Sequence, residues 1–105
     1  MTIQDIDPHD VARRLAEHSI VLIDVREPQE FAAERISGAL LFPLSSFDPA
    51  TLPDGDKREI VFHCGSGIRS AKAVSACEAV GIPCDLHMKG GIQAWKAAGL
   101  PTITG

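Results

Sequence analysis

The 105-residue sequence lacks the features of a membrane-spanning, secreted or nucleic-acid-binding chain. None of its apolar runs approaches the roughly 20 residues that a membrane-spanning helix needs. A membrane segment fused to this domain in a larger protein stays an open alternative. The first ten residues hold three aspartates and no apolar leader, so we expect no signal peptide and a cytoplasmic protein. With 10 Lys and Arg against 14 Asp and Glu, the net charge of −4 argues against nucleic acid as the main partner.

Cysteine is scarce as well. The three cysteines, Cys64, Cys77 and Cys84, all lie in the second half of the chain and cannot all pair with one another. Together with the missing leader, this number indicates a reducing compartment and at least one free thiol. The cysteines are too far apart for a two-cysteine zinc knuckle, so no metal is predicted, and no cofactor is expected.

No repeat, low-complexity stretch or linker divides the chain, which predicts a single domain over residues 1–105. Apolar and β-branched runs predict strands at residues 20–23, 39–42, 60–62 and 84–88. Helical periodicity and end signals predict helices at residues 8–18, 28–36, 70–80 and 92–98, and the polar segment 45–58 predicts a loop with one helical turn. This alternation with short connections predicts an α/β domain, with a mainly parallel sheet and helices on both of its faces.

The segment around Cys64 carries the strongest functional signal. The expected strand 60–62 brings Cys64 to the carboxyl edge of the sheet, where ligand sites of open α/β sheets lie. Gly65 and Gly67 follow, and a helix is expected to begin near Ser70. Such a loop can turn its backbone N–H groups inward, and the helix start adds further N–H groups and a positive dipole end. These groups would lower the pKa of the Cys64 thiol and stabilise an anionic adduct, so the pattern indicates a cysteine nucleophile.

The other two cysteines are expected in the core. Cys77 falls on the apolar face of the expected helix 70–80, with Ala73 and Val80, and Cys84 stands at the start of an expected strand. A buried cysteine is more often a small apolar residue than a nucleophile. The alternative that one of them resolves a Cys64 adduct, or forms a redox disulfide, is less favoured and stays open.

Four short motifs occur along the chain. They are Asp24-Val25-Arg26 with Glu30-Phe31, Ile36-Ser37-Gly38-Ala39, Cys64-x4-Arg69-Ser70, and Gly90-Gly91-x3-Trp95. In this order and spacing they resemble the rhodanese family of sulfurtransferases, and the resemblance covers nearly the whole chain. One departure is Glu34-Arg35, which stands where the family commonly has Gly-His and puts any histidine role there in doubt. The sequence also has no tyrosine.

The resemblance implies a rhodanese-like domain with a central, mainly parallel five-stranded sheet. It implies that Cys64 takes a sulfane sulfur from a donor such as thiosulfate, becomes a persulfide, and passes the sulfur to a thiol or cyanide-like acceptor. A protein donor or acceptor could replace either small molecule. The persulfide would lie in the loop formed by Gly65, Ser66, Gly67, Ile68, Arg69 and Ser70.

The resemblance also suggests supporting residues outside the backbone cradle. Arg69 would brace the loop and attract anionic donors, and Lys72 would add positive charge unless it is simply solvated helix surface. Asp24 and Arg26 resemble the structural pair of the family at the end of the first strand, where they would tie neighbouring loops together. Trp95 and the glycine pair before it would serve packing and turning.

Alternative functions are weighed against this one. The chain could be a persulfide carrier, or a regulatory rhodanese module of a larger protein. A cysteine phosphatase or arsenate reductase is less favoured, because the loops of phosphatases place five residues between cysteine and arginine and only four separate Cys64 from Arg69. His63 and His87 are candidates for a general acid, although packing or solvent exposure is the more usual role of such histidines.

Overall fold

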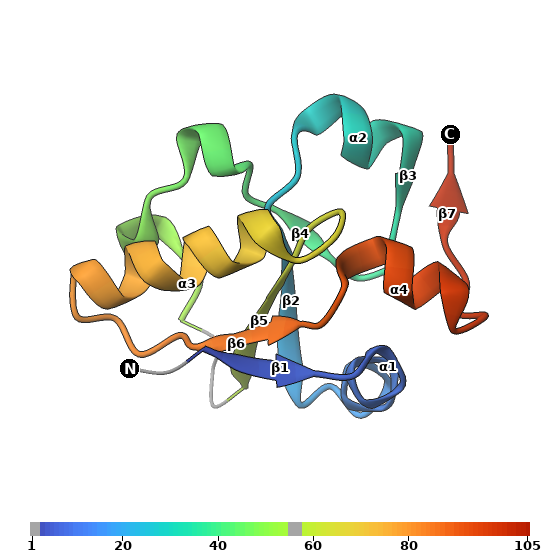
Figure 1. The fold of residues 1–105 in the computed structure, drawn as a ribbon, viewed down its shortest axis with the longest axis horizontal. Helices are drawn as coiled ribbons and strands as arrows, with labels where there is room; N and C mark the ends of the chain where they lie inside the picture. Colours follow the sequence, from blue (N-terminus) through green and yellow to red (C-terminus); the bar gives the residue numbers. More distant parts are fainter. Residues whose placement is uncertain (1–2, 55–57) are drawn as a thin grey trace.

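A five-stranded sheet forms the centre of the fold, as the computed structural model shows for residues 3–54 and 58–105 (Figure 1). All neighbouring strands in it are parallel, which confirms the predicted sheet. In spatial order the strands are β1 (Gln4–Ile6), β6 (Leu86–Met88), β5 (Glu59–His63), β2 (Ile20–Asp24) and β4 (Leu40–Leu41). The strand that ends just before Cys64 is therefore the central one.

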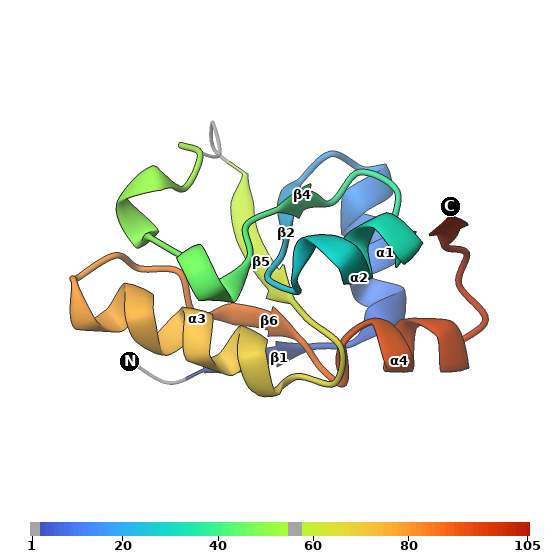
Figure 2. The ribbon, with the colours of Figure 1, turned by 90° about the horizontal axis from the view of Figure 1, so that it is seen from above.

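Helices cover both faces of the sheet. They are α1 (Pro8–Ala16), α2 (Pro28–Ala33), α3 (Ile68–Ala79) and α4 (Gly91–Ala97). Side chains of a strand alternate between the two faces, so β2 contributes Leu22 to one core and Ile23 to the other. Val11 of α1 and Trp95 of α4 pack in the first core, and Val74 of α3 packs in the second. In Figures 1 and 2, α3 accordingly runs beside β5 and β6, whereas α1 and α4 lie together.

Local sequence signals determine where the first two helices begin. The Asp7 carboxylate accepts a hydrogen bond from the His9 backbone N–H at 2.9 Å, and Pro8 occupies the first helical position of α1. At α2, Glu27 and Glu30 form a reciprocal capping box around Pro28. These caps satisfy N–H groups that have no partner inside a helix.

The second helix is shorter than predicted. It ends at Ala33, and the chain continues as β3 (Glu34–Arg35), which pairs antiparallel with β7 (Ile103–Thr104). The Arg26 guanidinium also donates to the Glu34 carbonyl at 2.6 Å, so bonds to distant segments replace those that a longer helix would make. Ile36 therefore lies outside the helix, but its side chain is still buried in the core.

Other boundaries also differ from the prediction. Helix α3 begins at Ile68, two residues earlier than expected, and β6 begins after Cys84. Val80 follows the end of α3 with a non-helical φ of −112°, so its side chain leaves the apolar face and is 63% exposed. Within the predicted loop 45–58 the chain forms short 3-10 turns at Leu44–Ser46 and Pro49–Thr51, and residues 55–57 lie outside the described part. None of the helices in the described ranges has the length and apolar character to cross a bilayer.

Candidate functional site

Cys64 directly follows β5, and the loop from β5 to α3 lies at the carboxyl edge of the sheet (Figure 2). The N-terminus of α4 holds the outer side of this loop, because the Ile92 N–H donates to the Cys64 carbonyl at 2.8 Å and the Gln93 N–H donates to the Gly65 carbonyl at 3.2 Å. A Cβ atom at Gly91 would overlap both of these carbonyl oxygens. The second glycine of the Gly90-Gly91 pair is therefore needed for the close approach of α4 to the cysteine loop.

The Cys64 sulfur accepts hydrogen bonds from the loop that follows it. The Gly67 N–H lies 3.1 Å from Sγ, and the Ser70 N–H lies 3.3 Å away. In the thiol form, the Cys64 S–H donates to the Ser70 hydroxyl oxygen at 3.6 Å. Gly67 adopts a left-handed φ of 110° directly before α3, which is a conformation that favours glycine. Both backbone donors thus come from the start of α3, where N–H groups are free to bind an anion.

The pKa of Cys64 reflects two opposing effects. The residue is only 1% exposed, and this burial by itself raises the pKa of the thiol. Hydrogen bonds from the Ser70 hydroxyl and from the backbone of Ser70, Gly67 and Ser66 outweigh burial and hold the pKa below its usual value. The loop therefore favours a thiolate at Cys64, which is the reactive form of cysteine.

Arg69 joins the cysteine loop to α2. Its Nη1 and Nη2 atoms lie 2.6 Å and 3.0 Å from the two carboxylate oxygens of Glu30. The hydrogen bond from Arg69 lowers the pKa of Glu30 to about 2, and the carboxylate in turn raises the pKa of Arg69. Sequence reasoning missed Glu30, although this residue belongs to the Glu-Phe part of the first motif.

Asp24 and Arg26 form a second, fully buried ion pair. Arg26 Nε lies 3.1 Å from both oxygens of the Asp24 carboxylate, and Nη2 lies 2.9 Å from Oδ2. Through its bond to the Glu34 carbonyl, Arg26 connects the end of β2 with β3. His63 packs against this pair, with Nε2 at 3.5 Å from Asp24 Oδ2, and burial lowers the pKa of the histidine. In the described part of the chain none of these three side chains contacts Cys64 Sγ by a hydrogen bond.

The comparisons with known proteins agree with this geometry. A family model described as "Rhodanese-like domain" matches residues 7–98. The chain belongs to the rhodanese-like domain family. A protein named sulfurtransferase from Allochromatium vinosum is 34% identical over 103 residues, which cover 96% of this chain and 95% of that protein. An uncharacterized Synechocystis protein is 38% identical over 98 residues, covering 93% of this chain and 55% of the relative, so the chain spans about half of that protein.

The fold has solved counterparts in the same family. A rhodanese-related protein from Thermoplasma volcanium superposes with a TM-score of 0.81 at 26% identity, and the match covers 95% of this chain and 97% of that one. The similarity of fold therefore extends over nearly the whole length of both chains.

Three predicted side chains of this rhodanese-like domain point to solvent. Ser66 and Ile68 of the loop are exposed, with Ile68 at 68%, so their side chains do not surround the Cys64 sulfur. Lys72 lies on the exposed side of α3 and makes no ion pair with any residue in the described ranges. Its contribution to anion binding stays a prediction.

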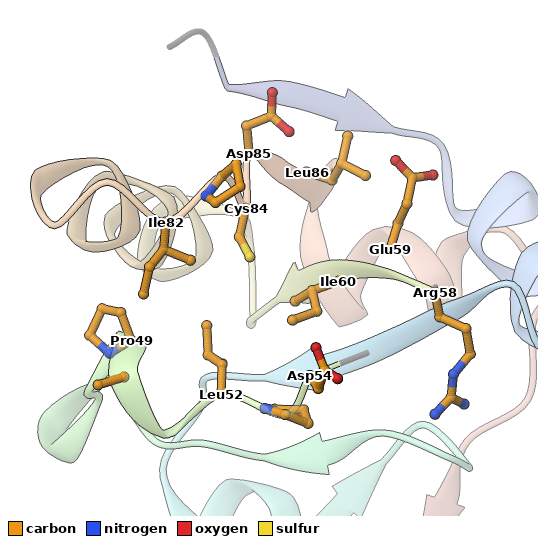
Figure 3. Close-up of a pocket in the computed structure, with 13 residues that line it drawn as sticks. Pro49, Leu52, Asp54, Arg58, Glu59, Ile60, Ile82, Cys84, Asp85 and Leu86 are labelled. Atoms are coloured by element: carbon orange, nitrogen blue, oxygen red, sulfur yellow. The ribbon is translucent and has the colours of Figure 1, made fainter. Parts of the chain in front are cut away.

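The remaining cysteines lie in a different environment. Both are free, and burial raises the pKa of Cys77 to about 11 and also raises that of Cys84. Cys84 lines a cavity of about 510 Å³ at the amino ends of β5 and β6, together with Leu52, Ile60 and Ile82 (Figure 3). The cavity thus lies at the opposite edge of the sheet from Cys64. Because their pKa values are raised, the Cys77 and Cys84 thiols stay protonated at neutral pH.

Two polar residues that the motifs did not include lie behind the cysteine loop. The Ser70 hydroxyl is 2.8 Å from His87 Nδ1, and His87 Nε2 is 2.6 Å from Asp5 Oδ1. The sequence indicates His87 as a candidate general acid, but it gives no local signal for Asp5, because no strand is predicted at the position of β1. No cluster of three or more metal-binding side chains occurs in residues 3–54 and 58–105.

Proposed function

We propose that this rhodanese-like domain is a sulfurtransferase that carries a sulfane sulfur as a persulfide on Cys64. The observation that best supports the proposal is the set of N–H groups of Gly67 and Ser70 directed at a sulfur whose pKa is lowered. Donors placed in this way stabilise a thiolate before the reaction and an anionic sulfur after it. The family match and the relative named sulfurtransferase support the same class of activity.

With thiosulfate as donor, the reaction proceeds by two displacements at sulfur. The Cys64 thiolate attacks the outer sulfur of thiosulfate, a new S–S bond forms, and sulfite leaves with the electron pair of the bond that breaks. The product is an anionic persulfide on Cys64. A nucleophile such as cyanide or a thiolate then attacks the terminal sulfur and restores the Cys64 thiolate, which gives ping-pong kinetics.

The remaining residues of the loop contribute charge and rigidity. Gly65, Ser66 and Ile68 complete the backbone ring around the persulfide. Arg69 keeps the loop in place through Glu30, and Lys72 would help to attract anionic donors. Asp24 and Arg26 connect the end of β2 with β3 and do not contact the sulfur. Because the reaction starts from a reduced thiol, the cytoplasm is the compartment that suits it. Residues 1–105 would act as one domain.

A phosphatase fits the arrangement less well. A phosphoryl group is commonly bound by a bidentate arginine, and both terminal nitrogens of Arg69 already bind the Glu30 carboxylate. Only four residues separate Cys64 from Arg69, so the ring is also small for a phosphoryl group with three free oxygens.

The test is formation of thiocyanate from thiosulfate and cyanide. The unaltered protein should turn over, Cys64→Ser should be inactive, and Cys84→Ser, which changes a thiol at the opposite sheet edge, should keep its activity. Hydrolysis of an aryl phosphate is measured in parallel. Phosphatase turnover that is lost in Cys64→Ser, without thiocyanate formation by the unaltered protein, would contradict the proposal.

A further inference from the structure

A chain of hydrogen bonds leads from Cys64 to the surface of the protein. Cys64 Sγ lies 3.6 Å from Ser70 Oγ, Ser70 Oγ lies 2.8 Å from His87 Nδ1, and His87 Nε2 lies 2.6 Å from Asp5 Oδ1. The three residues beyond the cysteine, Ser70, His87 and Asp5, come from α3, β6 and β1, which are distant in sequence. This series of hydrogen bonds joins the proposed nucleophile to an imidazole and a carboxylate that have no role in the reaction described above.

Burial decreases along this series of hydrogen bonds from Cys64 to Asp5. Cys64 and Ser70 are buried and His87 is 8% exposed, whereas the Asp5 side chain is 57% exposed. The last step follows from strand pairing, because Asp5 and His87 are register partners in the parallel pair of β1 and β6. Adjacent side chains at matched positions lie on the same face of a sheet, so β1 brings the carboxylate to the outer nitrogen of the ring.

The carboxylate also determines which ring nitrogen carries the proton. Asp5 accepts a hydrogen bond from Nε2–H, so in the neutral ring Nδ1 has a free lone pair. The Ser70 hydroxyl can then donate to Nδ1 and, with its own oxygen, accept the S–H of Cys64. The Gly67 carbonyl, 3.2 Å from Ser70 Oγ, is an alternative acceptor for the same hydroxyl proton, so the hydroxyl donates to Nδ1 when it turns away from this carbonyl.

We propose that Ser70, His87 and Asp5 form a relay that takes the proton from the Cys64 thiol, and this proposal rests on the proposed function. The S–H bond breaks as the proton moves to Ser70 Oγ, and the proton that Ser70 carried moves to His87 Nδ1. The products are a thiolate at Cys64 and an imidazolium at His87 next to the Asp5 carboxylate. The relay consumes no electrons, and both displacement steps at sulfur leave the imidazolium unchanged. His87 and Asp5 are thus positioning residues that act through Ser70.

The charged groups around His87 are few enough to separate by mutation. Asp5 faces it from β1, and the Cys64 thiol faces it through Ser70 from α3. On its own segment Asp85 and Lys89 stand two residues before and two residues after His87 in sequence, and β5 places the apolar Phe62 at the register position opposite it. Asp85 binds the Gln4 side chain at 3.1 Å and does not take part in the relay, which makes Asp85→Asn a matched control for Asp5→Asn.

The experiment measures the alkylation rate of Cys64 by iodoacetamide as a function of pH, with the modified peptide identified by mass spectrometry. His87→Gln should move the midpoint of the profile to higher pH by about one unit, which is roughly tenfold less thiolate below the midpoint. Asp5→Asn should move it in the same direction by a smaller amount. The relay predicts this rise because the imidazolium that accompanies the thiolate loses its carboxylate.

A simple charge effect makes the opposite prediction for Asp5→Asn. Removal of a negative charge near a thiol favours the thiolate and lowers the midpoint. Asp85 lines the cavity at the opposite sheet edge from Cys64, so Asp85→Asn should leave the midpoint nearly unchanged. A rise in Asp5→Asn with no rise in Asp85→Asn therefore supports the relay. A fall or no change in Asp5→Asn, or an unchanged midpoint in His87→Gln, would overturn it. Asp5 is exposed, so this variant keeps the test decisive even if His87→Gln fails to fold.

Ser70→Ala provides a second test, because it breaks the link between sulfur and ring. The midpoint should rise in Ser70→Ala, and addition of His87→Gln should raise it no further. Equal effects of His87→Gln with and without the serine hydroxyl would contradict the relay. Alkylation needs no sulfur donor, so the two proposals fail separately: persulfide formation without these shifts rejects only the relay, and the shifts without persulfide formation reject only the sulfurtransferase.

Discussion

The variant Glu30→Gln tests whether the ion pair between Glu30 and Arg69 braces the cysteine loop. Glutamine keeps the length of the side chain and the oxygen that accepts from the Glu27 N–H at 3.0 Å, so the cap of α2 survives. What is lost is the negative charge that holds both terminal nitrogens of Arg69. We expect a less stable protein and a more mobile loop around Cys64.

The size of the effect follows from the pKa of Glu30. Its fall from 4.5 to about 2 corresponds to roughly 3 kcal/mol of preference for the charged form, at about 1.4 kcal/mol per unit. Solvent screens the pair, because the side chains of Arg69 and Glu30 are 32% and 37% exposed. We therefore expect Glu30→Gln to lower the free energy of unfolding at neutral pH by about 1 kcal/mol.

The assay is urea unfolding of both proteins at several pH values. Because folding lowers the pKa of Glu30, its contribution is fully present above pH 4.5 and is lost as the pH falls towards 2. The difference between the two proteins should fall to less than half of its neutral value by about pH 3. A difference that is independent of pH from 7 to 3 would refute the reasoning.

A matched control is the exposed pair between Glu17 and Arg13, at 3.0 Å within and just beyond α1. Its side chains are 53% and 57% exposed, so Glu17→Gln should change stability less than Glu30→Gln. Equal losses in the two variants would show that burial against the loop adds nothing to the Glu30 pair.

Two further predictions concern the scaffold of the site. Gly91→Ala should destabilise the protein strongly and slow the alkylation of Cys64, because the added Cβ overlaps the carbonyls of the cysteine loop. The control is Gly99→Ala, at a φ of +80° with open space around it, which should lower the free energy of unfolding in urea by only about 1 kcal/mol. Asp24→Asn should lower the free energy of unfolding by about 3 kcal/mol or more, because it leaves the buried Arg26 guanidinium without its carboxylate. A loss below 1 kcal/mol in urea unfolding would contradict the assigned role of that pair.

Much of the fold could be predicted because its signals are local. The strand β2 begins with four apolar residues, α1 begins with a capping aspartate and a proline, and two glycines follow the cysteine of the loop. The strands that the prediction missed, β1, β3 and β7, have two or three residues each and, unlike β4, do not lie within a longer apolar run. Their formation depends on partners elsewhere in the chain, and that information is absent from any short window.

The same distinction applies to the candidate site. The loop from Cys64 to Ser70 could be located from a strand end, two glycines and a helix start, which are adjacent in sequence. Glu30 is 39 residues from Arg69, and Asp5 is 82 residues from His87. Such pairs follow from the order of strands and helices in space, so only the folded chain reveals them.

The most direct test of the central proposal is the mass of Cys64 after brief exposure to thiosulfate. We predict a gain of one sulfur, about 32 Da, on the Cys64 peptide, and its complete loss after cyanide is added. Cys77 and Cys84 should gain no sulfur, because burial raises the pKa of both thiols. Sulfur found on either of these cysteines and not on Cys64, or on none of the three with thiosulfate and other sulfane sulfur donors, would contradict the account.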